Sequence, residues 1–216
     1  MKIFNLDKKL LYELTNVDST TDADFSGLNL RYADFSEMNL SGSTFFGADL
    51  TGAKFCRARL RRSNFNESRI DNADFSWSKI HSAQLNNLSG INANFENSSV
   101  SSVSLCDSNF KGARFFWANL EESLFDDANI ANANFEYSFL HNTRFYNAIY
   151  KNANFERAVY LDYTKLGDGF ELDIKRICAK LESQGVSYTA AGFIGDMIRH
   201  PVIRKWESRF ADEFAR

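Results

Sequence analysis

The sequence has little of what marks several common protein classes. It holds one proline in 216 residues, and its 44% hydrophobic content is enough to form a core, which excludes a disordered, linker-rich chain. Three cysteines, an odd number, do not make a disulfide framework, so we expect a reducing, cytoplasmic location. No apolar run approaches the roughly 20 residues that span a bilayer, and the first residues lack the apolar stretch of a secretory signal. The net charge of −3 excludes a generally basic nucleic-acid binder.

What the sequence does have is phenylalanine at a regular interval. From Phe25 to Tyr160 every fifth residue is large and apolar, except Gly90, and 13 of the 21 phenylalanines fall on these 28 positions. The residue two places earlier is Ala, Ser or Thr in 24 of the 28 units. A period of five fits neither a helix, with 3.6 residues per turn, nor a strand, with a period of two. The pattern therefore indicates a repeat architecture.

Units such as ADFSG, ADFSE, ANFEN and ANLEE resemble the pentapeptide-repeat family, whose consensus is a small residue, Asp or Asn, Leu or Phe, and two polar residues. The resemblance covers about residues 21–164. It implies a bacterial β-solenoid, a right-handed quadrilateral β-helix with four five-residue faces in each 20-residue coil. Twenty-eight units then make about seven coils, and a spacing of ~4.8 Å between stacked strands makes the rod roughly 34 Å long.

A narrow square coil predicts the packing of the core. Inward Phe and Leu side chains would fill its middle and leave room only for small residues beside them. Side chains 20 residues apart would stack. Every twentieth residue from Phe35 to Phe155 is Phe and would form a phenylalanine ladder, and every twentieth residue from Leu40 to Leu140 is aliphatic and would form a second ladder. Leu88 is oversized and Gly90 undersized for their places in the unit, which suggests that volume is exchanged within one face.

Outward columns, again 20 residues apart, are mostly typical of turns. The column that takes every twentieth residue from Gly52 to Asn152 holds only Asn or Gly. Both residues tolerate a left-handed backbone at a corner. A ladder of Asn side chains that binds a ligand is the alternative.

One outward column combines aromatic and basic residues. It consists of Glu37, Arg57, Trp77, Asn97, Trp117, Tyr137 and Arg157. Phe116 is adjacent, and Arg114 lies on the same face. Outward Trp and Tyr beside Arg have the composition of interface hot spots, so this column is the candidate partner-binding face. The aromatic side chains could instead be covered by the terminal segments or stack as a ladder.

Two short segments of equal length carry opposite charge. Residues 54–69 have a net charge of +5 and residues 121–136 a net charge of −5. The basic set is Lys54, Arg57, Arg59, Arg61, Arg62 and Arg69, against Glu67, and the acidic set is Glu121, Glu122, Asp126, Asp127 and Glu136. Arg61 and Arg62 share columns with Glu121 and Glu122, three coils or ~14 Å away, which exceeds a Debye length of about 8 Å. The alternatives are a solvated mixed-charge surface, an electrostatic docking face, and head-to-tail pairing of rods.

No set of residues points to catalysis, so we predict that the protein is not an enzyme and has no catalytic residue, metal or cofactor. His81 and His141 share a column but lie three coils apart, too far for one metal or one proton relay. Cys56 and Cys106 fall on opposite faces and cannot pair. There is no Gly-rich phosphate loop, and an unbroken rod offers no concave pocket.

An open β-helix exposes strand edges at both ends, and these need caps. In residues 1–20, Asp7 precedes leucines at positions 10, 11 and 14, which suggests a short helix or an irregular cap. After residue 164 helical spacing replaces the five-residue period, so residues 165–216 are expected to be a helical appendage. It could cap the rod, form a homodimer or bind a partner helix.

The leading prediction for function is a non-enzymatic interaction or scaffold module with an unidentified protein partner. The resemblance implies an alternative, because some members of the family protect DNA gyrase from quinolones or peptide toxins by mimicking DNA. Mimicry needs an extended negative surface, whereas residues 20–165 carry 17 acidic against 14 basic residues. A third alternative is a secreted bacterial effector or a fragment of one.

Overall fold

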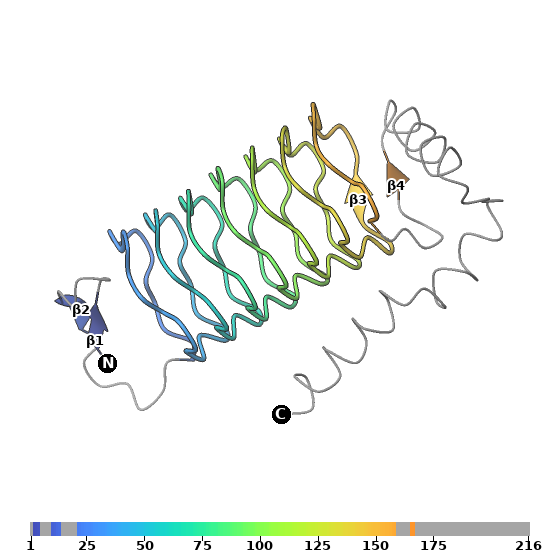
Figure 1. The fold of residues 1–216 in the computed structure, drawn as a ribbon. Coiled ribbons are helices and arrows are strands. Elements are labelled where there is room, and N and C mark those ends of the chain that lie inside the picture. The colour runs from blue at the N-terminus through green and yellow to red at the C-terminus, as the bar shows by residue number, and fades with distance from the viewer. Residues whose placement is uncertain (1, 5–9, 14–20, 159–164, 167–216) are drawn as a thin grey trace, which may run out of the picture. The chain divides into compact units, whose positions relative to one another are not determined.

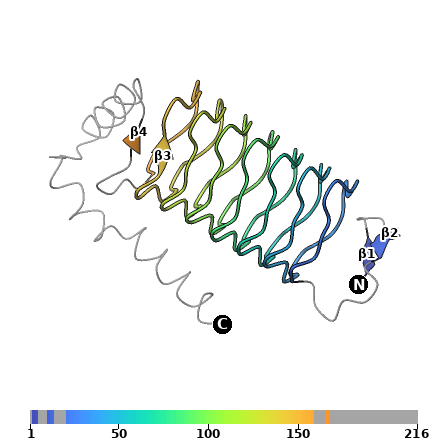
Figure 2. The ribbon, with the colours of Figure 1, turned by 180° about the vertical axis from the view of Figure 1, so that it is seen from behind.

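The computed structural model describes residues 2–4, 10–13, 21–158 and 165–166. Residues 21–158 form a β-solenoid in which the chain returns to the same face after each coil (Figures 1 and 2). Parallel bridges join the second residue of each unit to the residue 20 positions later, from Asp24 with Thr44 to Asn134 with Asn154. The predicted solenoid is therefore confirmed.

Backbone hydrogen bonds connect each coil to both of its neighbours. The amide of Phe45 donates to the carbonyl of Asn64 in the next coil (2.7 Å), and the amide of Thr44 donates to Ala23 in the preceding one (2.9 Å). Inside the unit, the amide of Ala48 donates to the carbonyl of Phe45 (3.0 Å) and closes the corner. Each coil thus satisfies the backbone hydrogen-bonding groups of the coils on either side of it.

The predicted core is confirmed by burial. Every fifth residue from Phe25 to Phe155 is buried, except Tyr150, which is partly exposed. Along the ladder at positions 35–155, successive ring centroids lie 4.7 to 5.0 Å apart. Rings of adjacent faces meet edge to face, as Phe45 and Phe55 do at 5.6 Å. Such aromatic pairs contribute about 0.5–1.5 kcal/mol beyond the area that they bury.

The position two residues before each core residue, which is usually Ala, can also be Ser because the serine hydroxyl donates a hydrogen bond to a backbone carbonyl. Ser98 donates to the carbonyl of Phe95 within its own unit (2.6 Å). Ser123 instead donates to Val100 in the preceding coil (2.6 Å). An unpaired buried hydroxyl would cost about 1–3 kcal/mol, so these bonds allow serine to replace alanine beside the core.

Every unit contains one corner residue with a left-handed backbone. From Asp22 to Arg157, each fifth residue has φ between 53° and 74°. Only five of these corner residues are glycine. Eight of them are Asn, which tolerates this conformation better than most residues. The left-handed backbone predicted for the corner column from Gly52 to Asn152 is thus confirmed, and the other three corner columns share it although many of their residues are neither Asn nor Gly.

The N-terminal residues add strands to the solenoid. β1 (Lys2–Phe4) pairs antiparallel with β2 (Leu10–Glu13), and the carbonyl of Phe4 accepts a hydrogen bond from the amide of Asp34 (2.9 Å). The alternative of a short helix here was wrong, since residues 10–13 are a strand. A strand can satisfy the unpaired backbone groups at the edge of the first coil, which a helix cannot do.

At the other end the strand pairing passes the expected boundary at residue 164. β3 (Arg144–Phe145) pairs parallel with β4 (Lys165–Leu166). Arg144 pairs with Lys165 instead of with position 164, so the last coil contains one extra residue. The rest of the expected helical appendage, residues 167–216, lies outside the described residues. No described segment is a helix with the length and apolarity needed to span a bilayer.

The space left by Gly90 is filled from the neighbouring coils. A Cβ atom at this position would lie 2.8 Å from two atoms of the Phe110 ring and 3.3 Å from Ile70. Phe110 follows Gly90 in a column whose earlier members are Leu or Ile. The compensation for Gly90 therefore comes from the next coil, whereas we expected it from Leu88 within the same face.

The substitution Gly90→Ala should lower the free energy of unfolding by about 1–3 kcal/mol, because the ring of Phe110 must shift to admit the methyl group. In a Phe110→Leu background the same substitution should cost less. Chemical denaturation of the four proteins in this double-mutant cycle measures the difference. Equal costs in both backgrounds would contradict the assignment.

Candidate functional site

The structure brings together most of the aromatic residues predicted to bind a partner. We call Trp77, Phe116, Trp117, Tyr137 and Arg157 the aromatic corner. Trp117 and Tyr137 stack with centroids 5.0 Å apart and planes 9° apart, and Phe116 meets Tyr137 edge to face at 5.6 Å. The guanidinium of Arg157 lies 5.3 Å from the centre of the Tyr137 ring and donates a hydrogen bond to its hydroxyl. The stack holds these outward rings in fixed positions.

Trp77 and the two other predicted arginines lie along the same side of the solenoid. Trp77 is half-buried and lies two coils before Trp117 in the same corner column, with Asn97 between them. Arg57 lies one coil further back, with its guanidinium 4.0 Å from Glu37. Arg114 forms an ion pair with Glu96 (2.9 Å).

The backbone at the aromatic corner does not favour aromatic side chains. Trp77, Trp117 and Tyr137 occupy corner positions with φ of 61°, 58° and 59°. The left-handed region costs residues with a Cβ atom about 1–2 kcal/mol. The remaining Trp or Tyr at a corner is Tyr32, whose ring covers Gly52 so closely that a Cβ there would lie 2.6 Å away.

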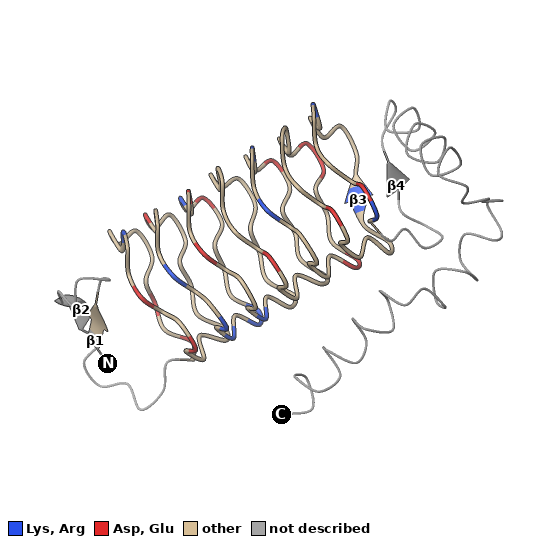
Figure 3. Ribbon diagram, in the orientation of Figure 1, with Lys and Arg blue, Asp and Glu red and all other residues tan. Residues whose placement is uncertain are grey.

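The predicted basic residues are spread over three faces and two corners of the solenoid, because Lys54, Arg59 and Arg69 belong to three different columns of bridges. Lys54 is half-buried, and Arg57, Arg59, Arg61 and Arg62 are exposed. Figure 3 shows Lys and Arg on neighbouring coils toward the N-terminal half of the solenoid. Among the described residues, Arg59, Arg61 and Arg62 form no ion pair, and Arg69 lies 3.9 Å from Asp71.

The acidic residues are partly paired. Asp126 forms an ion pair with Arg144, and Glu136 lies 3.6 Å from Arg157. Glu122 and Asp127 are exposed and Glu121 is half-buried. Within the described part of the chain no ion pair joins the basic segment to the acidic one.

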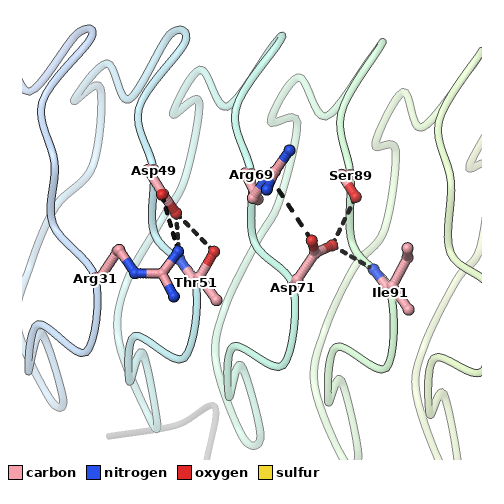
Figure 4. A network of polar contacts seen from close by, with 7 residues as sticks. All are labelled: Arg31, Asp49, Thr51, Arg69, Asp71, Ser89 and Ile91. Atoms are coloured by element: carbon pink, nitrogen blue, oxygen red, sulfur yellow. Dashed lines mark hydrogen bonds and ion pairs between the residues drawn. The ribbon is translucent and has the colours of Figure 1, made fainter.

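Many other outward polar residues connect coils to each other (Figure 4). Asp49 accepts hydrogen bonds from the amide of Thr51 (3.0 Å), from its hydroxyl (2.6 Å) and from Arg31 (3.1 Å). Burial alone would raise the pKa of Asp49, but these hydrogen bonds outweigh it and hold the pKa below the usual value. Asp71 likewise accepts from Ser89 (2.6 Å) and from the amide of Ile91 (2.9 Å) in the next coil.

The Asp or Asn at the second position of the unit has a structural role that we did not predict. Its side-chain oxygen accepts a hydrogen bond from the amide two residues later. Asp34 bonds to Ser36 in this way (3.0 Å), and Asn94 to Glu96 (3.1 Å). The preference for Asp and Asn at this position was the available signal, because these side chains form such local turns.

The cysteines and histidines in the described part of the chain form no catalytic arrangement. The thiol of Cys56 donates to Asp74 (2.9 Å), and burial, followed by this hydrogen bond, raises its pKa. A raised pKa makes the thiol less nucleophilic at neutral pH. His81 bonds to Ser101 through Nδ1 (2.7 Å). The described residues hold no group of three or more His, Cys, Asp or Glu that could bind a metal ion.

Two half-buried carboxylates predict a loss of stability in acid. The pKa values of Asp49 and Asp74 lie below the ordinary 3.8, so their stabilising effect is present above pH 3.8 and is lost as the pH falls through the lowered values. Asp49→Asn and Asp74→Asn should therefore flatten the fall in unfolding free energy between about pH 6 and about pH 2.5.

Denaturation at a series of pH values measures this slope. The control is Asp127→Asn, which changes an exposed carboxylate with no ion pair among the described residues. A slope that is the same in all four proteins would show that the two half-buried carboxylates do not stabilise the fold.

Comparison with known proteins agrees with the repeat pattern. The family model described as pentapeptide repeats matches in eight copies, over residues 21–55, 43–81, 91–126 and 123–159. No curated protein matches the sequence.

The solved structures that are similar to this chain include the following three. The pentapeptide repeat protein Rfr23 from the cyanobacterium Cyanothece 51142 is 19% identical, with 52% of this chain and 88% of that one covered and a TM-score of 0.37. QnrB1, a plasmid-mediated fluoroquinolone resistance protein, is 22% identical, with 68% and 84% covered and a TM-score of 0.40. HetL from Nostoc sp. strain PCC 7120, involved in heterocyst differentiation regulation, is 19% identical, with 68% and 88% covered and a TM-score of 0.23.

Proposed function

Because the chain belongs to the pentapeptide-repeat family, we propose that it is a non-enzymatic module that binds a protein partner through the aromatic corner. The repeat provides a rigid support, since every coil is hydrogen-bonded to its neighbours and the core rings stack without a break in register. The aromatic corner is the outward group on this support that the fold itself does not require.

The observation that carries the proposal is the backbone conformation of these residues. Three of the four Trp and Tyr residues at left-handed corners fall in one column, at positions 77, 117 and 137. Their conformational cost, about 1–2 kcal/mol each, is of the same size as the gain of about 0.5–1.5 kcal/mol from an aromatic stack. Stability alone therefore does not favour aromatic residues over Asn or Gly here, so a role in binding explains them better.

The chemistry of the corner suits a protein surface. Half-buried rings that are already stacked lose little conformational entropy on binding. Arg157 and Arg114, held by Glu136 and Glu96 at the rim, offer further donors to acceptor groups of a partner. Large rigid aromatics with adjacent Arg are the residues that dominate measured interface energies.

The double substitution Trp117→Asn and Tyr137→Asn tests the proposal. Asn suits a left-handed corner, so the free energy of unfolding should change by less than about 1.5 kcal/mol. Binding to the partner should weaken at least ~30-fold, as expected for the loss of hot-spot residues. Quantitative affinity capture from a bacterial lysate, with the unsubstituted protein and the variant in parallel, identifies proteins that depend on the corner.

The matched control is Tyr32→Asn, which removes an aromatic residue from a corner on another column. It should leave capture unchanged. If the double variant retained the same proteins as the control, the aromatic corner would not be the binding site. A loss of stability in the double variant well beyond the small change expected for it would assign the rings a structural role instead.

The distribution of charge weighs against a DNA-mimicking protector of gyrase. Such a protein needs an extended negative surface, whereas exposed Arg59, Arg61 and Arg62 interrupt it in mid-solenoid. In a gyrase supercoiling assay with a fluoroquinolone, we expect saturating protein to leave inhibition unchanged. Restored supercoiling would overturn this preference and support mimicry.

A further inference from the structure

One corner of the solenoid carries opposite charges on either side of an uncharged middle. We call this corner, formed by the adjacent columns 41–141 and 42–142, the charged edge. In successive coils it presents Ser41 and Gly42, Arg61 and Arg62, His81 and Ser82, Ser101 and Ser102, Glu121 and Glu122, and His141 and Asn142. The two arginines and the two glutamates lie at equal distances from the middle.

These charges do not compensate each other within one chain. Three coils separate Arg61 from Glu121, which at ~4.8 Å per coil is more than the Debye length of about 8 Å. Glu122 accepts a hydrogen bond from Ser102 (2.9 Å). Among the described residues, none of the four charged side chains forms an ion pair.

We propose that the charged edge binds the same edge of a second copy of this chain, with the two solenoids antiparallel. The two-fold axis would pass between the coil of Ser82 and the coil of Ser101. It would place Arg61 and Arg62 opposite Glu121 and Glu122 of the second copy, and the reverse pairing follows from the symmetry. One such dimer gains four contacts between arginine and glutamate.

The rest of the edge is compatible with this pairing. His81 and Ser82 would lie opposite Ser101 and Ser102, and Ser41 and Gly42 opposite His141 and Asn142, so no two like charges would face each other at these positions. Asp22, in the first coil of the same corner, would lie opposite position 162, which is outside the described residues. On the adjoining face, Arg59 would meet the uncharged Asn119, and Lys79 the uncharged Ser99. The small residues in the middle allow the two chains to approach closely.

The order of charges along the edge explains why a second copy fits better than a partner that is negatively charged along its whole length. A nucleic acid or a wholly acidic peptide laid along the edge would be attracted by Arg61 and Arg62. It would then be repelled by Glu121 and Glu122 in the same columns. A partner must reverse its charge along its length, and a second copy in antiparallel orientation does so without further adjustment.

Sedimentation velocity over a range of concentrations tests the proposal. At about 50 mM salt the full chain should form dimers, and at about 500 mM salt it should dissociate, because exposed ion pairs are screened. R61E/R62E and E121R/E122R should each weaken association at least ~10-fold, since both place like charges opposite each other. An equimolar mixture of these two variants should form a heterodimer, and the quadruple variant should again form a homodimer.

The matched control is K111E/K151E, which changes the net charge by the same amount as R61E/R62E but lies on another corner. It should dimerise as the unsubstituted chain does. The aromatic-corner variant should also dimerise normally, so failure of the proposed function would not affect this result.

Three outcomes would overturn the proposal. The chain could remain monomeric at low salt and high concentration. It could form a dimer that ignores all charge reversals, which would assign dimerisation to another region such as residues 165–216. Finally, R61E/R62E and E121R/E122R could fail to associate with each other when mixed, although circular dichroism shows that both are folded.

Discussion

The structure depends on one spacing, the distance of about 4.8 Å between strands that share hydrogen bonds. Backbone bonds and core rings must both repeat at this distance, and the stacked phenylalanines do so, at 4.7 to 5.0 Å. The fold can meet both demands because flat rings stack at almost the same spacing as strands. The core is therefore selected for rings and branched aliphatics of one thickness, and Gly90 is tolerated only because Phe110 occupies the vacant space.

The left-handed corner sorts the outward residues into two kinds. Asn and Gly at corners, and Asp or Asn at the second position of the unit, satisfy the backbone and explain most of the polar surface. Residues that oppose these preferences need another explanation. Trp117 and Tyr137 occupy a conformation that disfavours them, and Arg61 forms no ion pair with a described carboxylate. The two proposed interfaces are built on these residues for that reason.

The sequence predicts those features that repeat and misses those that occur once. Because four units of five residues make one coil, the inward column and the members of the aromatic corner follow from arithmetic. The strand at residues 10–13, the extra residue before β4 and the ring that fills the space at Gly90 each depend on one local packing solution. The contact of Phe116 with Tyr137 also depends on side-chain rotamers, which the period does not determine.

The uninterrupted register has a consequence for how the molecule can change. Inserting or deleting a single pentapeptide would leave the hydrophobic pattern intact, and the core would still fill. Every later side chain would nevertheless turn by one face, a quarter of the way around the solenoid. Glu121 would then leave the column of Arg61, and Tyr137 would leave that of Trp77. The surface is therefore far more sensitive than the fold to the number of units, and only the gain or loss of a full coil preserves its alignment.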